Sequence, residues 1–321
     1  MSPQPRTRRP HRAARNRPAQ VRACIRRRRT AAAYAKEIVL DARTEPPPRH
    51  HANGSAPAEY PVGPAERTRQ AESGVGPGVP LGRQVRHPYL NGKSAAYATL
   101  DILRAAHGID PGAGATALVY GGSQGGHAAL WTAHYADEYA PDVDLKGVVA
   151  NAPAVGFEWM PALFAQQNAM ATPYAGMLLL INGASAADPA VKPAELLTPD
   201  ALAAADRVWT ESCIVGDTVL PPAEDILRPG VDLGPLNAAL KGSAGNEVTT
   251  KVPVLLPQGG NDVLSSLNQA LARQLCDKGV NLEFKYYADQ GHTISDDPLD
   301  DAIALMDARR FGTPVAASCV F

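Results

Sequence analysis

The chain has 321 residues, of which 45% are hydrophobic and 20% are charged. This length and apolar content are enough to bury a sizeable core, and we expect one large α/β domain with an insertion rather than two independent domains. The formal net charge of -1 gives no overall electrostatic preference for nucleic acid, although the basic excess is concentrated before His87 and the remainder of the chain is acidic.

The beginning of the chain is dense in arginine, proline and alanine. It includes Arg26–Arg29 and Pro46–Pro48, and only Glu37–Leu40 has the pattern of a short strand. We therefore set residues 1–84 apart as a basic segment and expect the folded domain over residues 85–321. The segment has three interpretations: a disordered tail, an arm that binds nucleic acid or an acidic surface, or a stretch specified by the wrong reading frame or start site. The binding arm is the weakest, because prolines interrupt the arginines and no aromatic residues alternate with them.

Targeting signals are weak in the visible sequence. The first residues carry charges suited to the start of a signal peptide, but no apolar stretch of seven or more residues follows them. Export is therefore not encoded at this terminus. The apolar runs elsewhere are far below the roughly 20 residues of a membrane span, so we expect a soluble chain.

The most informative stretch is Tyr120–His127, with the sequence YGGSQGGH. A strand-like apolar run precedes it and a helix-like run from Ala128 to Tyr139 follows it, which is the setting of a nucleophile elbow. Gly121 and Gly125 allow the strand and the helix to approach closely enough for such a sharp turn. Ser123 is therefore the candidate nucleophile.

Two further polar residues follow in the order that a nucleophile-elbow fold requires, which is serine, acid, histidine. The run 252–257 predicts a buried parallel strand, and Asp262 lies in the loop after it. A helix over 264–278 and a strand over 281–287 then lead to a loop that ends in His292. Because the carboxyl ends of parallel strands share one edge of a sheet, we expect these side chains to meet Ser123 there.

These three residue types suit nucleophilic catalysis. His292 would take the proton from Ser123 and later return it to the leaving group, while Asp262 would fix the imidazole tautomer. Two alternatives stay open for the acid: Asp262 as an ordinary turn residue, and Asp289 as the partner of His292. The histidines at 87, 107, 127 and 134 are expected to be structural or solvated, and the incomplete G-x-S-x-G pattern at 183–187 is expected to be a loop.

Five segments between about His87 and Cys319 together resemble the secretory lipase family of α/β-hydrolases. This resemblance implies a mostly parallel sheet with a helical cap, and serine hydrolysis of acylglycerols or related carboxylic esters. It also implies Ser123 as nucleophile, Asp262 as acid, His292 as base and the backbone amide of Gln124 as one oxyanion-hole donor. The segments are HPYLNGKSAAYATLDILRAA, GGSQGGHAALW, YAPDVDLKGVVANAP, VPVLLPQGGNDVL and YYADQGHT.

The stretch between Ser123 and Asp262 is longer than a minimal sheet needs. After a strand predicted over 145–150, apolar helical patches at 157–170 and 177–181 replace the alternation of strands and helices. We expect a cap insertion over about 153–245, whose apolar inner face holds acyl chains. Ordinary core packing is the alternative for each of its helices.

In the resembled family, the first sheet strands and a His-Gly-type loop with the second oxyanion donor precede the elbow. That motif does not occur here, so we expect the first strands to be missing or replaced. The abrupt change near His87 favours the frame or start-site interpretation of residues 1–84. Because loss of one oxyanion donor costs about 100- to 1000-fold in turnover, a catalytically impaired hydrolase-like fragment is one alternative function. A serine peptidase of the same fold is the other.

Four cysteines are present, and Cys213, Cys276 and Cys319 lie in the region of resemblance, whereas Cys24 does not. A disulfide among those three is expected if the protein is exported, with the pair left open. No C-x-x-C, H-E-x-x-H or phosphate-binding loop occurs, so we expect no metal or cofactor, and the expected partner is a small ester or lipid substrate. The resemblance suggests secretion, whereas the visible terminus does not; neither sets the oligomeric state.

Overall fold

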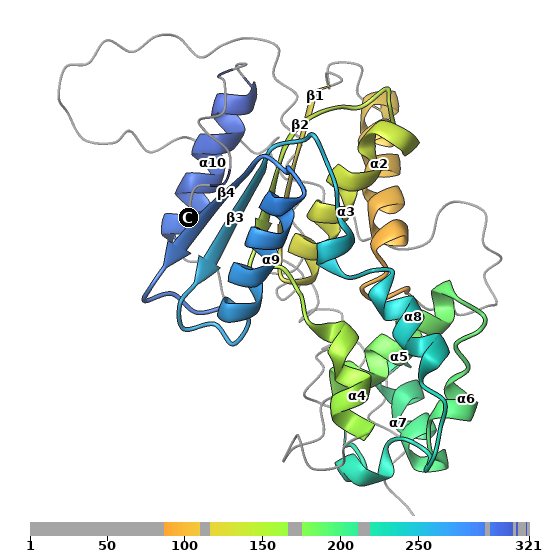
Figure 1. Ribbon diagram of the computed structural model, residues 1–321. Coiled ribbons are helices and arrows are strands. Elements are labelled where there is room, and N and C mark those ends of the chain that lie inside the picture. The colour runs from red at the N-terminus through yellow and green to blue at the C-terminus, as the bar shows by residue number, and fades with distance from the viewer. Residues whose placement is uncertain are drawn as a thin grey trace, which may run out of the picture.

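The structure is a computed structural model (Figure 1). It describes residues 87–109, 116–165, 175–210, 219–292 and 296–310, together with positions 313 and 319. The predictions for residues 1–84, including the first strands, and for Cys213 fall outside the described residues.

Within these residues, parallel strands form a four-stranded sheet in the spatial order β1-β2-β3-β4. Helix α3 (Gln124–Tyr139) connects β1 to β2, and helix α9 (Ser265–Asp277) connects β3 to β4. This is the parallel α/β architecture that the alternating strand and helix patterns predict, with slightly shifted bounds. The strands are β1 (Thr116–Gly122), β2 (Asp144–Asn151), β3 (Val254–Gly259) and β4 (Leu282–Tyr287).

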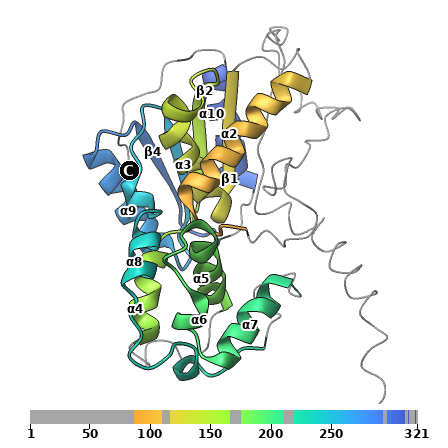
Figure 2. The same ribbon diagram turned by 90° about the vertical axis from the view of Figure 1, so that its right-hand side faces the viewer.

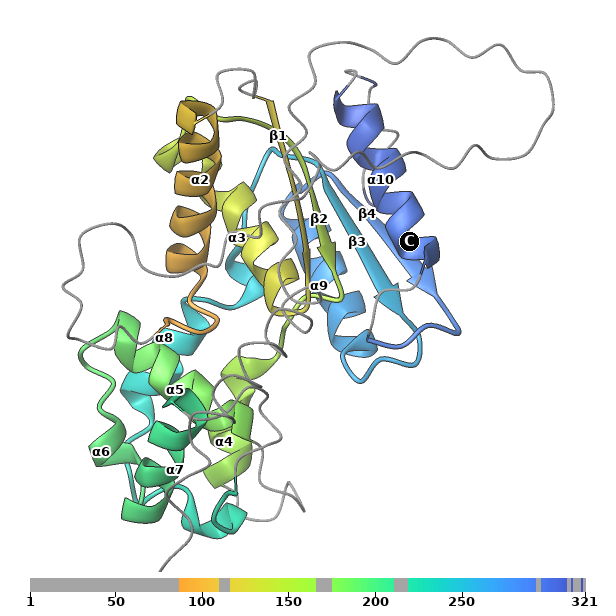
Figure 3. The same cartoon turned by 180° about the vertical axis from the view of Figure 1, so that it is seen from behind.

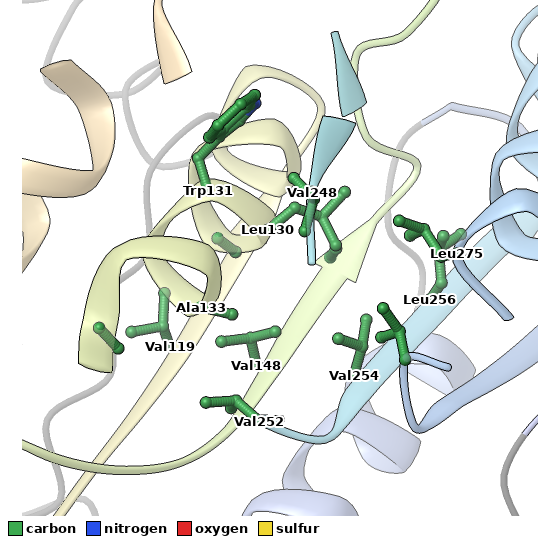
Figure 4. Close-up of a cluster of buried hydrophobic side chains, with 14 of the residues drawn as sticks. Val119, Leu130, Trp131, Ala133, Val148, Val248, Val252, Val254, Leu256 and Leu275 are labelled. Atoms are coloured by element: carbon green, nitrogen blue, oxygen red, sulfur yellow. The ribbon is translucent and has the colours of Figure 1, made fainter. Parts of the chain in front are cut away.

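Both faces of the sheet are covered, which explains why β1 and β3 are buried nearly throughout, whereas β4 (LEFKYY) alternates between buried and partly exposed residues. Side chains of α3 and α9 pack on one face (Figure 4), where helix α2 (Gly92–Ile109) joins the same cluster, and helix α10 (Asp296–Arg310) covers the opposite face (Figure 3). Successive strand residues alternate between the two faces. The first face receives Val119, Val148, Val254 and Leu256, and the second receives Leu118, Tyr120, Val149 and Leu255.

The chain between β2 and β3 forms a group of helices, here called the helical insertion, at the carboxyl-terminal end of the sheet (Figures 1 and 2). It has a hydrophobic cluster of its own, in which Met177, Leu178 and Ile181 are fully buried. The apolar patch at 177–181 is therefore core rather than cleft lining. The α-helices are α4 (Met160–Ala165), α5 (Ala175–Ala187), α6 (Pro193–Leu196), α7 (Pro199–Thr210) and α8 (Gly234–Lys241), and the 3-10 helices are η2 (Phe157–Trp159), η4 (Ala223–Asp225) and η5 (Gly245–Glu247).

The loop predicted at 183–187 is wrong, because these residues complete helix α5. A Cβ on Gly183 would lie 2.5 Å from the backbone N and O of Tyr89, so this glycine lets α5 pack directly against another segment of backbone. Asn182 reinforces the packing by donating from Nδ2 to the carbonyl of Ala205 at 3.1 Å. Tertiary contact thus outweighs the low helix propensity of glycine.

Cys276 on α9 forms a disulfide with Cys319, which settles the pairing that the sequence leaves open. The backbone N–H of Cys319 also donates to the carbonyl of Leu282 at 2.7 Å, so this residue is attached to both α9 and β4. Among the helices that the structure describes, none has the length and apolar character required to cross a bilayer.

Candidate active site

Ser123 occupies the turn between β1 and α3. Its φ of 54° and ψ of -114° lie where residues other than glycine are rarely found, at a typical cost of roughly 1–3 kcal/mol. Two backbone hydrogen bonds hold it there: its N–H donates to the Asn151 carbonyl, and its carbonyl accepts from the Ala154 N–H, both at 2.9 Å. This is the strained elbow geometry that the sequence predicts.

Glycines on both sides of Ser123 permit the close approach of backbone segments. A Cβ on Gly121 would lie 2.1 Å from the carbonyl oxygen of Gly125, as the motif reading anticipates. A Cβ on Gly126 would lie 2.9 Å from the carbonyl oxygen of Asn151 at the end of β2. The requirement at Gly126 was missed, because no local pattern indicates that the helix start touches a different strand.

The structure brings together the three side chains singled out from the sequence. His292 Nε2 lies 2.9 Å from Ser123 Oγ, and His292 Nδ1 lies 2.8 Å from Asp262 Oδ2. Since a carboxylate only accepts hydrogen bonds, Nδ1 carries the proton toward Asp262 and Nε2 presents its lone pair to the serine hydroxyl. Asp262, rather than the exposed Asp289, is thus the aspartate in contact with the imidazole.

Two adjacent glycines hold the loop of Asp262 against the loop of His292. A Cβ on Gly259 would lie 2.2 Å from the Gly291 carbonyl oxygen, and one on Gly260 would lie 2.4 Å from the Ala288 carbonyl oxygen. The Gly260 N–H donates to the Tyr287 carbonyl at 2.8 Å, which extends the pairing of β3 and β4 into the loops. The backbones of the two loops are therefore in direct contact.

Two buried amides support Asp262, and sequence reasoning missed both. Gln258 Nε2 donates to Asp262 Oδ2 at 2.9 Å, and Asn268 Nδ2 donates to Gln258 Oε1 at 2.7 Å and to the Pro153 carbonyl at 3.1 Å. Both amide side chains are fully buried. A polar residue inside the apolar run of β3 was the available signal for Gln258, whereas Asn268 lies on a helix with no distinguishing pattern.

The hydrogen bonds around Asp262 favour its ionised form. Burial alone would raise the pKa of this carboxyl, but donation from the Leu264 N–H, His292 and Gln258 outweighs burial and lowers the pKa below its ordinary value. The side chain of Asp262 is closed to solvent, whereas that of His292 is 44% exposed. A carboxylate at neutral pH thus stands behind an imidazole that substrate and water can reach.

Gln124 follows the nucleophile as the first residue of α3. Its backbone N–H lies in the first helical turn, where amides have no acceptor within the helix and the helix dipole is positive. Its side-chain Nε2 lies 3.0 Å from Nε2 of His87. Within the described ranges, no three His, Cys, Asp or Glu side chains gather as metal ligands would.

His127, one turn beyond the nucleophile, is buried where α3 meets the end of the helical insertion. Its Nε2 donates to the Ser243 carbonyl at 2.7 Å, and Trp131 Nε1 donates to the same oxygen at 3.1 Å. The Gly92 N–H donates to Ser243 Oγ at 3.2 Å. Ser243 therefore joins α2 and α3 to the end of the helical insertion. His127 has a structural role there, as its position just inside the helix after the elbow suggests.

Burial of His127 makes a pH-dependent contribution to stability. Burial lowers the pKa of His127 from 6.5 to about 4, against a smaller opposing effect of the Ser243 carbonyl. The unfolded chain therefore binds this proton first as the pH falls, and about 3 kcal/mol of unfolding free energy is lost between pH 6.5 and pH 4. Denaturant unfolding of the native chain and of His127→Gln across this range measures the effect. The difference in unfolding free energy between the two proteins is expected to change by about 3 kcal/mol across this range. A difference that does not depend on pH would contradict a lowered pKa for His127.

The model of the secretory lipase family matches residues 82–216, a range that includes the elbow and most of the helical insertion. Over these residues the chain is similar to the secretory lipase family. Asp262 and His292 lie beyond the matched range, so their assignment depends on the geometry described above. No curated protein matches the chain significantly.

Solved structures of hydrolases share the fold of this chain. Lipase A from Candida antarctica in its closed state superposes with a TM-score of 0.60 at 20% identity, covering 72% of this chain and 57% of that one. The rice cell wall degrading esterase LipA from Xanthomonas oryzae has a TM-score of 0.51 at 20% identity, covering 71% of this chain and 65% of that one. The predicted α/β-hydrolase fold is confirmed, and the chain spans less than two thirds of these proteins' length.

Proposed function

We propose that this chain is a serine carboxylic-ester hydrolase that acts on acylglycerols or related esters. The observation that carries the proposal is the series of two hydrogen bonds from Asp262 to His292 to Ser123, at 2.8 and 2.9 Å. A histidine so placed between a buried carboxylate and a strained serine can act as a general base. The match of residues 82–216 to the secretory lipase family supports esters over peptides as substrates.

The arrangement supports a two-step acyl transfer. Ser123 Oγ attacks the ester carbonyl carbon while His292 Nε2 takes the hydroxyl proton, and the oxyanion accepts the Gln124 N–H. Collapse of the tetrahedral intermediate expels the alcohol, which takes its proton from His292, and leaves an acyl group on Ser123. Water then repeats the sequence, with His292 again as base, and releases the acid. Asp262 stabilises the imidazolium in both steps.

The proposal is tested by labelling with a fluorophosphonate probe and by hydrolysis of p-nitrophenyl butanoate. We expect Ser123→Ala to abolish labelling and His292→Ala to lower both rates by about 1000-fold or more. Ser266→Ala, an exposed serine on α9, is the matched control and should behave as the native chain. Labelling that survives Ser123→Ala would remove the site assignment. Labelling of Ser123 with hydrolysis near background would instead indicate the impaired hydrolase.

A further inference from the structure

An apolar cavity lies beside the nucleophile, between α2, α3 and β1. Its volume is about 50 Å³, counted as space open to the centres of water-sized groups. Ala95, Thr99 and Ile102 line it from α2 at spacings of four and three residues, which places them on one face of that helix. Gln124 and Ala128 line it from α3, one turn apart. The cavity thus begins at the residue next to Ser123.

The walls of the cavity suit a hydrocarbon. The described residues that line it include no aspartate, glutamate, lysine or arginine. Thr99 donates its hydroxyl to the Ala95 carbonyl at 2.9 Å, so its hydrogen-bonding demand is met within α2. His127 also borders the cavity, and burial keeps it neutral at neutral pH by lowering its pKa to about 4. An apolar group entering this space would displace water without leaving a charge desolvated.

The position of His292 indicates which half of an ester would enter. Its Nε2 must protonate the leaving alcohol, so the alcohol oxygen lies on the side of Ser123 from which the loop after β4 approaches. The cavity lies on the other side, toward α2, beyond Gln124, whose N–H would hold the oxyanion. A carbonyl bound between these two groups directs its carbon substituent toward the cavity.

We propose that the cavity between α2 and α3 binds the acyl chain of the substrate and restricts it to short chains. This inference rests on the proposed ester hydrolase. The small volume of the cavity, about 50 Å³ for the centres of water-sized groups, leaves room for only a short run of methylene groups. The best substrates are therefore esters of short-chain acids, and Ile102 sets the limit of chain length.

The kinetic test compares p-nitrophenyl esters from ethanoyl to dodecanoyl. Ile102→Ala should lengthen the preferred chain and raise the octanoyl-to-butanoyl ratio of kcat/KM by at least about tenfold. Ala95→Leu should shorten the preference toward ethanoyl. Ile303→Ala removes the same atoms from a half-exposed position on α10 and should leave the profile unchanged. Hydrolysis that requires Ser123 but keeps the native profile in both cavity variants would overturn the acyl site and leave the proposed function standing.

A binding measurement separates the acyl site from catalysis. Ser123→Ala cannot form the acyl-enzyme, so its ligand-observed NMR reports only on non-covalent contact with hexanoate. We expect saturation transfer from Ser123→Ala to hexanoate, and at least a tenfold weaker effect when Ala95→Leu is added. Transfer that is equal in both proteins would overturn the cavity assignment, whatever the ester assays show. If Ala95→Leu removes the transfer but the native chain shows no esterase activity, the proposed function is contradicted instead.

Discussion

Asp262→Asn is expected to lower turnover by about 10⁴-fold while leaving the affinity for ester substrates nearly unchanged. In the native site, the carboxylate accepts the Nδ1 proton of His292 at 2.8 Å, and this leaves Nε2 free to accept the Ser123 proton. An asparagine amide can donate to Nδ1, which stabilises the opposite tautomer. The proton then sits on Nε2, and the serine faces a donor instead of a base.

The control for this test is a second aspartate, taken from the loop that carries His292. Asp289 is exposed and three residues from His292, so Asp289→Asn changes charge close to the site without altering the tautomer. Burst and steady-state kinetics with an activated ester give kcat and KM for both variants, and thermal unfolding checks that each is folded. If Asp289→Asn loses turnover while Asp262→Asn keeps nearly native activity, Asp289 and not Asp262 is the acid that supports His292.

The meeting of Ser123, Asp262 and His292 was predictable because a local pattern marks each of these residues. Parallel strands buried on both faces read as apolar runs, and a polar residue just beyond each run lies at the carboxyl edge of the sheet. Ser123 and Asp262 follow such runs, and His292 follows the alternating strand β4, so the order of strands brings all three to one edge. The backbone strain at Ser123 was predictable in kind, since the flanking glycines imply a sharp turn.

The supporting contacts were not predictable, because they join residues that are remote in sequence. Asn268 finds its acceptors on Pro153 and Gln258, and nothing near it in sequence indicates either. Helix α5 continues through Gly183, where the backbone of Tyr89 packs against it. The choice of Cys319 as the partner of Cys276 likewise depends on the packing of the chain end beside α9 and β4. Long-range packing decides what local pattern leaves open.

Gly259→Ala is expected to lower kcat by about 100-fold, although the substituted residue contacts no substrate in the proposed mechanism. A Cβ at this position would lie 2.2 Å from the carbonyl oxygen of Gly291 and 2.5 Å from that of Gln290. Both are backbone atoms, so no side-chain rotation relieves the overlap. The loop that carries His292 must move, by about an ångström, away from the loop of Asp262.

This displacement should lower the reactivity of Ser123 without unfolding the protein. The register of β3 with β4 ends at Gly259 and Tyr287, so most of the ladder lies below the collision and the sheet should persist. Gly242→Ala is the matched control, because a Cβ there meets its nearest atom at 3.5 Å, an ordinary contact. Slow fluorophosphonate labelling of Gly259→Ala, with circular dichroism and disulfide content like those of Gly242→Ala, would identify the shifted imidazole as the cause. Native labelling rates in Gly259→Ala would mean that the spacing of the two loops does not control the reactivity of Ser123.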